Sequence, residues 1–360
     1  MLSIVLMAAA MTPDANACAG IFHEEGLLAE SDTQEVILED IGDGAVQVHY
    51  RAVYEGDSPD FGWIIPVPGV ITDLDDGDLA DFDDVRDVSQ PIIDRFYEST
   101  SEDSSGGCGR ASKGGDALNL ADTGYASDRA GNGVSVLAEG FTGTYDYALL
   151  EATDASELLQ WLDDNGWSVG GSEADLEAYI ADGWQFAALG VAVDEAETYE
   201  DGRELPPVTL TYEGDMAFPA RMARAAGAAE QRTTLYVIGD QRARITSGWS
   251  EGTLPKISGD INDDAEALYQ DALRDLSADA ATYAVTYSDD FDSRWLTRFD
   301  TLTPAADHTA DPVLVVDAGD QKASTEIELH EGGATRRSNH RGLLLLLAPM
   351  LGLGWSLRRR

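Results

Sequence analysis

The pentapeptide Gly248-Trp-Ser-Glu-Gly252 is the stretch of this sequence that comes nearest to a catalytic motif. It matches the G-x-S-x-G pattern, in which a serine nucleophile occupies a sharp turn between a strand and a helix. Pro255 follows so closely that a helix cannot begin where this turn requires one. Only His308, among the downstream histidines, lies away from the C-terminal tail and could act as the base. Ser250 is therefore a candidate nucleophile, although a chance match in a glycine-rich loop is the interpretation that we favour.

Carboxylates are the second possible source of chemistry. The chain has 67 acidic residues, so spacing alone cannot single out a pair suited to glycoside hydrolysis. The densest group is Asp73, Asp75, Asp76 and Asp78, which could hold calcium loosely at extracellular concentrations. In a chain this acidic, a solvated run of charge is the favoured interpretation. We therefore expect no cofactor, with calcium at these four aspartates as the alternative.

The two cysteines, Cys18 and Cys108, are the only ones in the chain. If the protein is exported to an oxidising compartment, the simplest arrangement is one disulfide between them. The alternative is that Cys18 becomes a lipid-modified N-terminus. Ala15 and Asn16 fit the residues that usually precede a lipidated cysteine poorly, so we favour the disulfide.

The net charge limits the partners of this protein. Against its 67 acidic residues stand 23 basic ones, which gives a formal charge of −44, and only three of the basic residues are lysines. Such a field repels nucleic acid and anionic lipid surfaces, so we exclude both as partners of the folded body. A lysine-poor, aspartate-rich surface also suits high salt, where counterions screen the repulsion.

Both ends of the chain have features of export and anchoring. Residues 2–11 form an apolar segment, and Ala15-Asn-Ala17 has the small-x-small pattern of signal peptidase cleavage, so residues 1–17 are expected to be a signal peptide. Residues 342–357 carry no charge and are followed by three arginines. A helix of that length would reach roughly 24 Å, a thin membrane span. We expect a linker at 331–341 and a hydrophobic anchor or sorting tail at 342–360.

This tail resembles the tripartite C-terminal sorting signals of Gram-negative bacteria, in which a short motif precedes a hydrophobic segment and an arginine cluster. Gly332-Gly333 is similar to the diglycine version of the motif. Eight residues, 334–341, separate the glycines from the apolar run, and the cysteine of the myxobacterial version is absent. The resemblance implies a surface protein that is held in the membrane or released by processing of the tail.

Between these ends, alternating apolar residues predict a sheet-rich domain over residues 18–330. Residues 45–54 and 60–69 alternate as strands, and the turn formers between them predict an antiparallel hairpin. Further strands are expected at 36–41, 134–138, 145–150, 185–193, 208–212, 233–238, 284–287 and 313–317. The tract 99–133 lacks apolar periodicity and is expected to be a mobile loop. The domain could form one body or two lobes.

Helices are predicted where apolar residues recur at helical spacing, in three of the four cases after a capping residue. The expected helices run from Leu79 to before Pro91, from Asp154 to Asn165, from Ser172 to Asp182 and from Asp263 onward. The second and third are short and amphipathic, and we expect them to cover one sheet. Because strands and helices do not alternate regularly, the fold class is predicted as α+β, with mostly antiparallel sheets and short amphipathic helices packed on one face.

The order of several runs resembles a known family. The runs at 60–68, 145–152, 159–167 and 210–215, together with a cysteine just after the signal peptide, are similar to the bacterial domain-of-unknown-function 2330 family. The likeness covers residues 18–245. It implies an exported bacterial protein and carries no known activity, so no catalytic residues are transferred.

Two functions follow from these observations. The first is an exported, membrane-anchored envelope or cell-surface protein that binds a protein or envelope partner without catalysis. It would lie in the periplasm or on the cell surface and contact the membrane through 342–357. The alternative is an exported hydrolase using carboxylates or Ser250. A pocket with convergent polar groups would favour the hydrolase, and a closed sheet surface would favour the binding protein.

Overall fold

The structure is a computed structural model that describes residues 20–23, 29–30, 33–56, 60–97, 133–165, 173–192, 198–199, 202–204, 207–224, 229–278 and 280–331. The predicted signal peptide, both cysteines, residues 99–132 of the predicted loop and the anchor 342–360 lie outside these residues. No helix within the described ranges is both long and apolar enough to cross a membrane.

A five-stranded antiparallel sheet contains the apolar run at 63–67. Its order is β1 (Gly20–His23), β5 (Asp60–Val67), β10 (Gln185–Ala192), β9 (Tyr145–Ala152) and β8 (Val134–Phe141). Trp63 and Ile65 pack into the core on one face of β5, and Ile64 packs into a second core on the other face. A strand that is buried on both faces needs an interior position with neighbours on both sides.

The predicted hairpin of residues 45–54 with 60–69 is wrong. Both segments are strands, but β4 (Ala45–Gly56) pairs with β3 (Thr33–Gly42) and other strands of a different sheet, whereas β5 pairs with β1 and β10. Consecutive strands pair only about two-thirds of the time. Here the two-sided burial of β5 is satisfied by β10, more than a hundred residues later.

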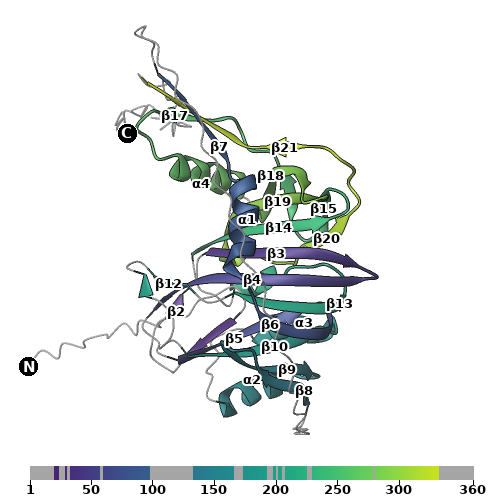
Figure 1. Ribbon diagram of the computed structural model, residues 1–360. Helices are drawn as coiled ribbons and strands as arrows, with labels where there is room; N and C mark the ends of the chain where they lie inside the picture. The colour runs from purple at the N-terminus through teal and green to yellow at the C-terminus, as the bar shows by residue number, and fades with distance from the viewer. Residues whose placement is uncertain are drawn as a thin grey trace, which may run out of the picture.

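The larger sheet has twelve strands. Its main path is β11 (Thr198–Tyr199), β12 (Gly202–Glu204), β4, β3, β14 (Glu230–Gly239), β19 (Arg294–Pro304), β18 (Thr282–Phe291) and β16 (Ser250–Gly252), with β13 (Val208–Gly214), β6 (Gly69–Asp76), β2 (Ala29–Glu30) and β21 (Ala323–Ser324) pairing at its sides. Within this sheet, the described ladders are antiparallel except β3 with β14 and β16 with β18. The strands run across the long axis of the molecule (Figure 1).

Two small sheets complete the described strands. One pairs β15 (Ala243–Ser247) with β20 (Val313–Val316), and the other has the order β17 (Ile257–Asp260), β22 (Glu326–His330), β7 (Ile92–Phe96) with parallel ladders. Short 3₁₀ helices occur at Ala220–Arg224 and Ala305–Asp307. The fold is therefore α+β and dominated by antiparallel sheet, as the sequence predicts.

The helices cover the outer faces of the two main sheets. Side chains of α2 (Ala155–Asp164) and α3 (Glu173–Ala181) share one core with the five-stranded sheet, which confirms the prediction for these two helices. Those of α1 (Leu79–Ser89) and α4 (Ala265–Leu276) pack on the large sheet in two further cores. The largest core combines residues of both sheets, so the sheets pack against each other. Figure 1 shows α2 and α4 near opposite ends of the molecule.

Helix caps follow the sequence closely, with one shift. Asp154 accepts a hydrogen bond from the backbone N–H of Glu157 and begins α2, as predicted. Asp264, not Asp263, caps α4 by accepting from the N–H of Glu266 at 3.0 Å. The side chain of Asp263 instead accepts from the N–H of Asp260, within the turn that leads into the helix.

Candidate functional site

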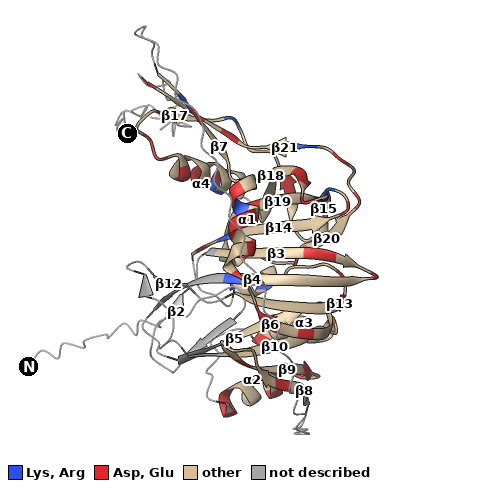
Figure 2. Cartoon of the chain, viewed as in Figure 1, with Lys and Arg blue, Asp and Glu red and all other residues tan. Residues whose placement is uncertain are grey.

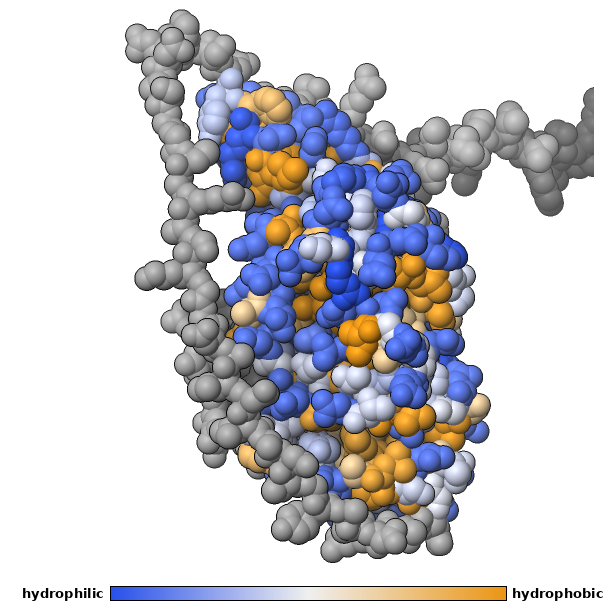
Figure 3. Space-filling model, turned by 45° about the vertical axis from the view of Figure 1, so that its right-hand side comes forward, coloured by the Kyte–Doolittle hydropathy of each residue, from blue (hydrophilic) through white to orange (hydrophobic). Residues whose placement is uncertain are grey.

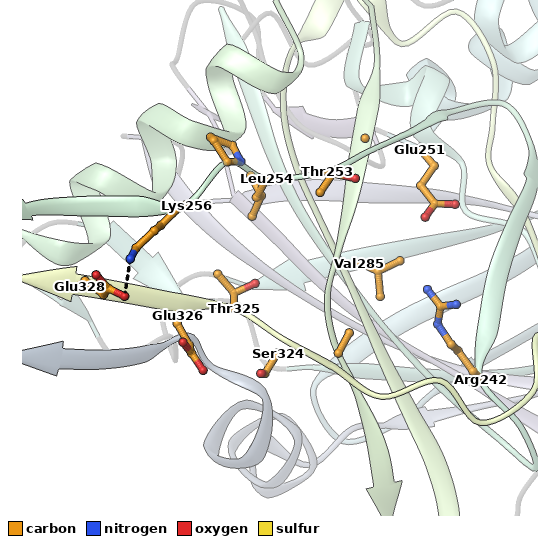
Figure 4. A pocket seen from close by; sticks show the side chains of 13 residues that line it. Arg242, Glu251, Thr253, Leu254, Lys256, Val285, Ser324, Thr325, Glu326 and Glu328 are labelled. Carbon is orange, nitrogen blue, oxygen red and sulfur yellow. Dashed lines mark ion pairs between the residues drawn. The ribbon is translucent and has the colours of Figure 1, made fainter. Parts of the chain in front are cut away.

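A pocket of about 600 Å³ lies where β16 and the segment after it face β21 and β22. Val285 of β18 also lines it (Figure 4). In the pairing of β18 with β19, the register shifts between Val285 and Tyr287, a β-bulge of the kind that often re-aims a side chain at a site. The lining residues are Arg242, Glu251, Gly252, Thr253, Leu254, Pro255, Lys256, Val285, Ala323, Ser324, Thr325, Glu326 and Glu328.

Arg242 stands at one end of this pocket, in the turn between β14 and β15. Its backbone is fixed, because its N–H donates to the carbonyl of Gly319 at 3.0 Å and its carbonyl accepts from the N–H of Ala318 at 2.9 Å. Figure 4 shows its side chain extending into the pocket toward Val285. The Nε atom is buried and meets no hydrogen-bond acceptor among the described residues.

The pairing of the other arginines makes Arg242 unusual. Apart from Arg95 and Arg242, each arginine whose side chain the structure describes has a carboxylate partner. Arg95 is exposed on β7, where water solvates it. In a chain with 67 acidic residues against 23 basic ones, a partly buried guanidinium without a carboxylate partner is the exception.

Glu251 lies near Arg242 but does not neutralise it. The Oε2 atom of Glu251 accepts a long hydrogen bond, 3.4 Å, from the hydroxyl of Tyr283. Burial, and then the charge of Glu251, raise the pKa of Tyr283 to about 12, so its phenol keeps its proton at neutral pH. This end of the pocket therefore offers a guanidinium, a carboxylate and a nearby neutral hydroxyl.

At the opposite end of the pocket, the charged groups are mostly paired. Lys256 Nζ lies 2.7 Å from Glu328 Oε1, and Nε2 of His330 lies 3.2 Å from Glu328 Oε2. The hydrogen bond from Lys256 holds the pKa of Glu328 below its ordinary value. Figure 4 shows this ion pair and Glu326 on the side away from Arg242.

Ser250 does not meet a base in this structure. It is exposed at the start of β16, and its N–H donates to the carbonyl of Ala281 at 3.1 Å. Its neighbour Trp249 is buried and lies beside His308, with ring centroids 5.7 Å apart. Since adjacent residues of an extended chain point to opposite sides, Ser250 and His308 are directed apart. The helix of a nucleophile elbow is also missing here, because the next helix, α4, begins at Ala265.

The two glycines of the pentapeptide have packing roles. Gly248 has φ +91°, and a Cβ there would lie 2.1 Å from the carbonyl oxygen of Asp311. A Cβ at Gly252 would lie 2.6 Å from Leu276 and 2.8 Å from Thr282. Gly248 is therefore required by its backbone conformation and by a backbone contact, and Gly252 packs closely against two side chains, so the match to the catalytic motif needs no catalytic explanation.

The four aspartates considered for calcium lie on β6 and at the start of α1. Asp73 and Asp75 are exposed on either side of the buried Leu74. Asp76 accepts from the hydroxyl of Thr142 at 2.5 Å, and Asp78 accepts from the N–H of Ala80 as the N-cap of α1. Within the described part of the chain, no group of three or more His, Cys, Asp or Glu side chains is arranged to hold a metal ion.

Two smaller pockets contain charged groups that already have partners. One, of about 330 Å³, is lined by His49 and Asp81, whose Nδ1 and Oδ2 atoms are 3.5 Å apart, and Nδ1 also lies 3.0 Å from the hydroxyl of Thr209. Burial lowers the pKa of His49 and raises the pKa of Asp81. The attraction between the two groups acts on each pKa in the opposite direction but is the smaller effect. The other, of about 410 Å³, contains the Arg221–Asp311 ion pair.

Sequence reasoning did not single out Arg242, Glu251 or Lys256. Arg242 and Lys256 lie in connecting segments with no motif around them, and Glu251 lies on β16 within the G-x-S-x-G match, where Ser250 was the candidate. Among the described residues Arg242 has no acidic partner in space, and no spacing along the chain reveals this.

Comparison with known proteins identifies one matching family. A family model described as an uncharacterized protein conserved in bacteria (DUF2330) matches residues 12–310, which agrees with the resemblance read from the sequence and leaves the C-terminal tail outside the match. No curated protein matches the chain.

Among solved structures, baculovirus P35 is similar at 8% identity and a TM-score of 0.32, over 80% of this chain and 97% of that one. A mutated baculovirus P35 after caspase cleavage is similar at 6% identity and a TM-score of 0.29, over 81% and 99%. Similarity at these TM-scores supports no conclusion about the fold or function of this chain.

Proposed function

Because this chain belongs to the DUF2330 family of uncharacterized proteins conserved in bacteria, we propose that it is an exported, membrane-anchored envelope or cell-surface protein. It acts by binding a ligand in the pocket lined by Arg242, not by catalysis.

The location rests on the two ends of the sequence. The apolar segment 2–11 followed by Ala15-Asn-Ala17 supports export, and the uncharged run 342–357 followed by three arginines supports retention in a membrane. With the arginines on the cytoplasmic side, the acidic body lies outside the cytoplasm, in the periplasm or on the surface. The Cys18–Cys108 disulfide belongs to the same proposal, because an oxidising compartment permits it.

Deleting residues 332–360 tests the location. The full-length protein should be recovered with the membrane fraction of the expressing bacterium, and the truncated protein should be soluble outside the cytoplasm. Replacing Ala15 and Ala17 with bulky residues should retain the signal peptide, seen as a larger mass. Membrane retention of the truncated protein would contradict the anchor.

The binding role rests on one observation, the pocket of about 600 Å³. Its described lining contains hydrogen-bonding groups, but it contains no histidine and no serine that a base activates. Its volume is that of a small-molecule site. Filling it with Ser324→Trp should abolish the thermal shift produced by any ligand found in a small-molecule screen. Ser247→Trp, at an exposed position outside the lining, is the matched control and should leave that shift unchanged.

The hydrolase remains the second candidate, and the presence of a polar pocket next to Ser250 is the observation that favours it. Its test is hydrolysis of activated esters and glycosides by the purified protein. If the protein showed turnover and Ser250→Ala or Glu251→Gln abolished it, the proposed binding function would have to be replaced by catalysis. We expect no such turnover, because Ser250 and His308 point apart.

A further inference from the structure

The guanidinium of Arg242 has no carboxylate partner among the described residues, and this indicates which class of ligand the pocket binds. We infer that the pocket takes a small molecule through a single carboxylate group held by the Arg242 guanidinium. This inference rests on the binding function proposed above and names the ligand class of the same site.

The first argument is the state of the Arg242 guanidinium. Its Nε–H is buried and meets no acceptor among the described residues, so this part of the group is desolvated. A ligand in the pocket meets the terminal nitrogens, whose attraction to a negative charge is strengthened by this poorly solvated surrounding. The two terminal nitrogens lie in one plane and match the two oxygens of a carboxylate, so one group can accept from both.

The second argument is that the protein does not supply this carboxylate itself. Of the arginines whose side chains the structure describes, all but Arg242 and the solvated Arg95 pair with an aspartate or glutamate. The nearby Glu251 accepts from Tyr283 and forms no ion pair with Arg242. The fixed backbone of Arg242, held by the carbonyl of Gly319 and the N–H of Ala318, keeps the guanidinium at the pocket.

The surrounding charge limits the ligand to one negative charge. Glu251, Glu326 and Glu328 also line the pocket, and of these only Glu328 is paired with a lysine, Lys256. With a formal charge of −44 on the whole chain, a phosphate or dicarboxylate would meet repulsion that a single guanidinium cannot offset. A monocarboxylate meets the least repulsion while satisfying Arg242.

Between the two charged ends, part of the lining is aliphatic. Leu254, Pro255, Val285 and Ala323 contribute aliphatic surface next to the hydroxyls of Thr253 and Ser324. The preferred ligand therefore has a carboxylate at Arg242 and a short aliphatic chain directed along the pocket (Figure 4).

The test uses isovalerate, with its neutral amide isovaleramide as the matched probe. The arginine Nε–H resonances of the intact exported domain are followed by ¹⁵N NMR during titration, at constant ionic strength. Isovalerate should shift the Arg242 Nε–H resonance in a saturable manner, and isovaleramide should bind at least about tenfold more weakly, the usual value of a charge-assisted hydrogen bond. Arg242→Gln should weaken isovalerate binding at least as much.

Two further variants make the test specific. Arg242→Lys keeps the charge but loses the fork, and should bind isovalerate less tightly than the natural protein. Arg95→Gln removes a solvated arginine outside the pocket that, within the described part of the chain, also has no carboxylate partner, and this variant should bind isovalerate normally. If Arg242→Gln does not fold, the titration of the natural protein and of Arg242→Lys still decides the question.

Several results would overturn the inference. These are an Arg242 resonance that does not move, equal binding of isovalerate and isovaleramide, an equal shift with chloride or inorganic phosphate, or undiminished binding by Arg242→Gln. If other small molecules still bind and Ser324→Trp excludes them, the carboxylate inference fails and the binding function stands. If the pocket binds nothing and ester turnover is found, the proposed function fails instead.

Discussion

His308 is a buried imidazole with no hydrogen-bond partner for either ring nitrogen among the described residues. Its ring lies against Trp249, whose own Nε1 also lacks a partner there. Because this surrounding solvates a charge poorly, burial lowers the pKa of His308 to about 4. The imidazole is therefore neutral in the folded protein at neutral pH.

This shift predicts how stability depends on pH. Above about pH 6.5, the ordinary histidine pKa, neither the folded nor the unfolded state protonates His308, and its contribution is complete. Between pH 6.5 and about 4 only the unfolded state takes up the proton, so the free energy of unfolding falls by on the order of 3 kcal/mol in total. Below that range the contribution is lost and does not change further.

Urea unfolding at a series of pH values checks this prediction. In His308→Leu, the free energy of unfolding should no longer fall between pH 6.5 and about 4. The variant Thr309→Ala, at the exposed neighbouring position, should keep this pH dependence. An identical pH profile for His308→Leu and the natural protein would rule out His308 as the source.

At the scale of elements, Asp300 connects the large sheet to a helix that covers it. This carboxylate on β19 accepts from Arg298 Nε at 2.7 Å, from the hydroxyl of Thr234 on β14 at 2.7 Å and from the hydroxyl of Tyr269 on α4 at 3.0 Å. Thr286 of β18 also donates to it. Burial alone would raise the pKa of Asp300, but Arg298 and these hydrogen bonds hold it below its ordinary value.

Because every partner of Asp300 is desolvated, removing its charge should be costly. Asp300→Asn leaves Arg298 buried without a counterion and should lower the free energy of unfolding by about 3–5 kcal/mol. The comparison is Asp317→Asn, which breaks the exposed Arg244–Asp317 pair and should have little effect, because water and salt screen such pairs. Chemical denaturation of both variants is the measurement, and equal losses would contradict the network's role.

At the scale of the whole molecule, charge repulsion is the dominant feature. Carboxylates are spread over most of the described elements, with few lysines or arginines between them (Figure 2). On the face shown in Figure 3, hydrophilic residues surround small separate groups of apolar ones. The ion pairs of the described residues cannot balance a formal charge of −44, so the folded state confines like charges.

Sodium chloride should therefore stabilise this protein. The Debye length falls from about 10 Å at 0.1 M to about 3 Å at 1 M salt, which screens the repulsion, and the melting temperature should rise over that range. Calcium is the rival explanation, since specific binding at Asp73, Asp75, Asp76 and Asp78 would stabilise by mass action. If calcium raised the melting temperature strongly even in high sodium chloride, and Asp75→Asn abolished that rise, the result would favour specific binding at those four aspartates over general screening.

Features that depend on neighbours along the chain could be read from the sequence. Alternation of apolar residues located β4, β5, β9, β10 and β14, the helical spacing from Leu79 located α1, and the cap Asp154 located the start of α2. The family was also accessible, because the resemblance rests on runs of contiguous residues. Within such segments, side chain and backbone interact over a few residues, so local pattern and local structure agree.

Strand pairing and the burial of polar residues depend on contacts between distant parts of the folded chain. β19 was missed because Thr297, Arg298 and Asp300 give it the pattern of an exposed segment, although all three are buried among partners from other elements. The same holds for the pairing of β5 with β10 and for the unpaired Arg242. Burying a charged or polar side chain depends on partners that folding brings from distant positions, and no local pattern in the sequence records whether they arrive.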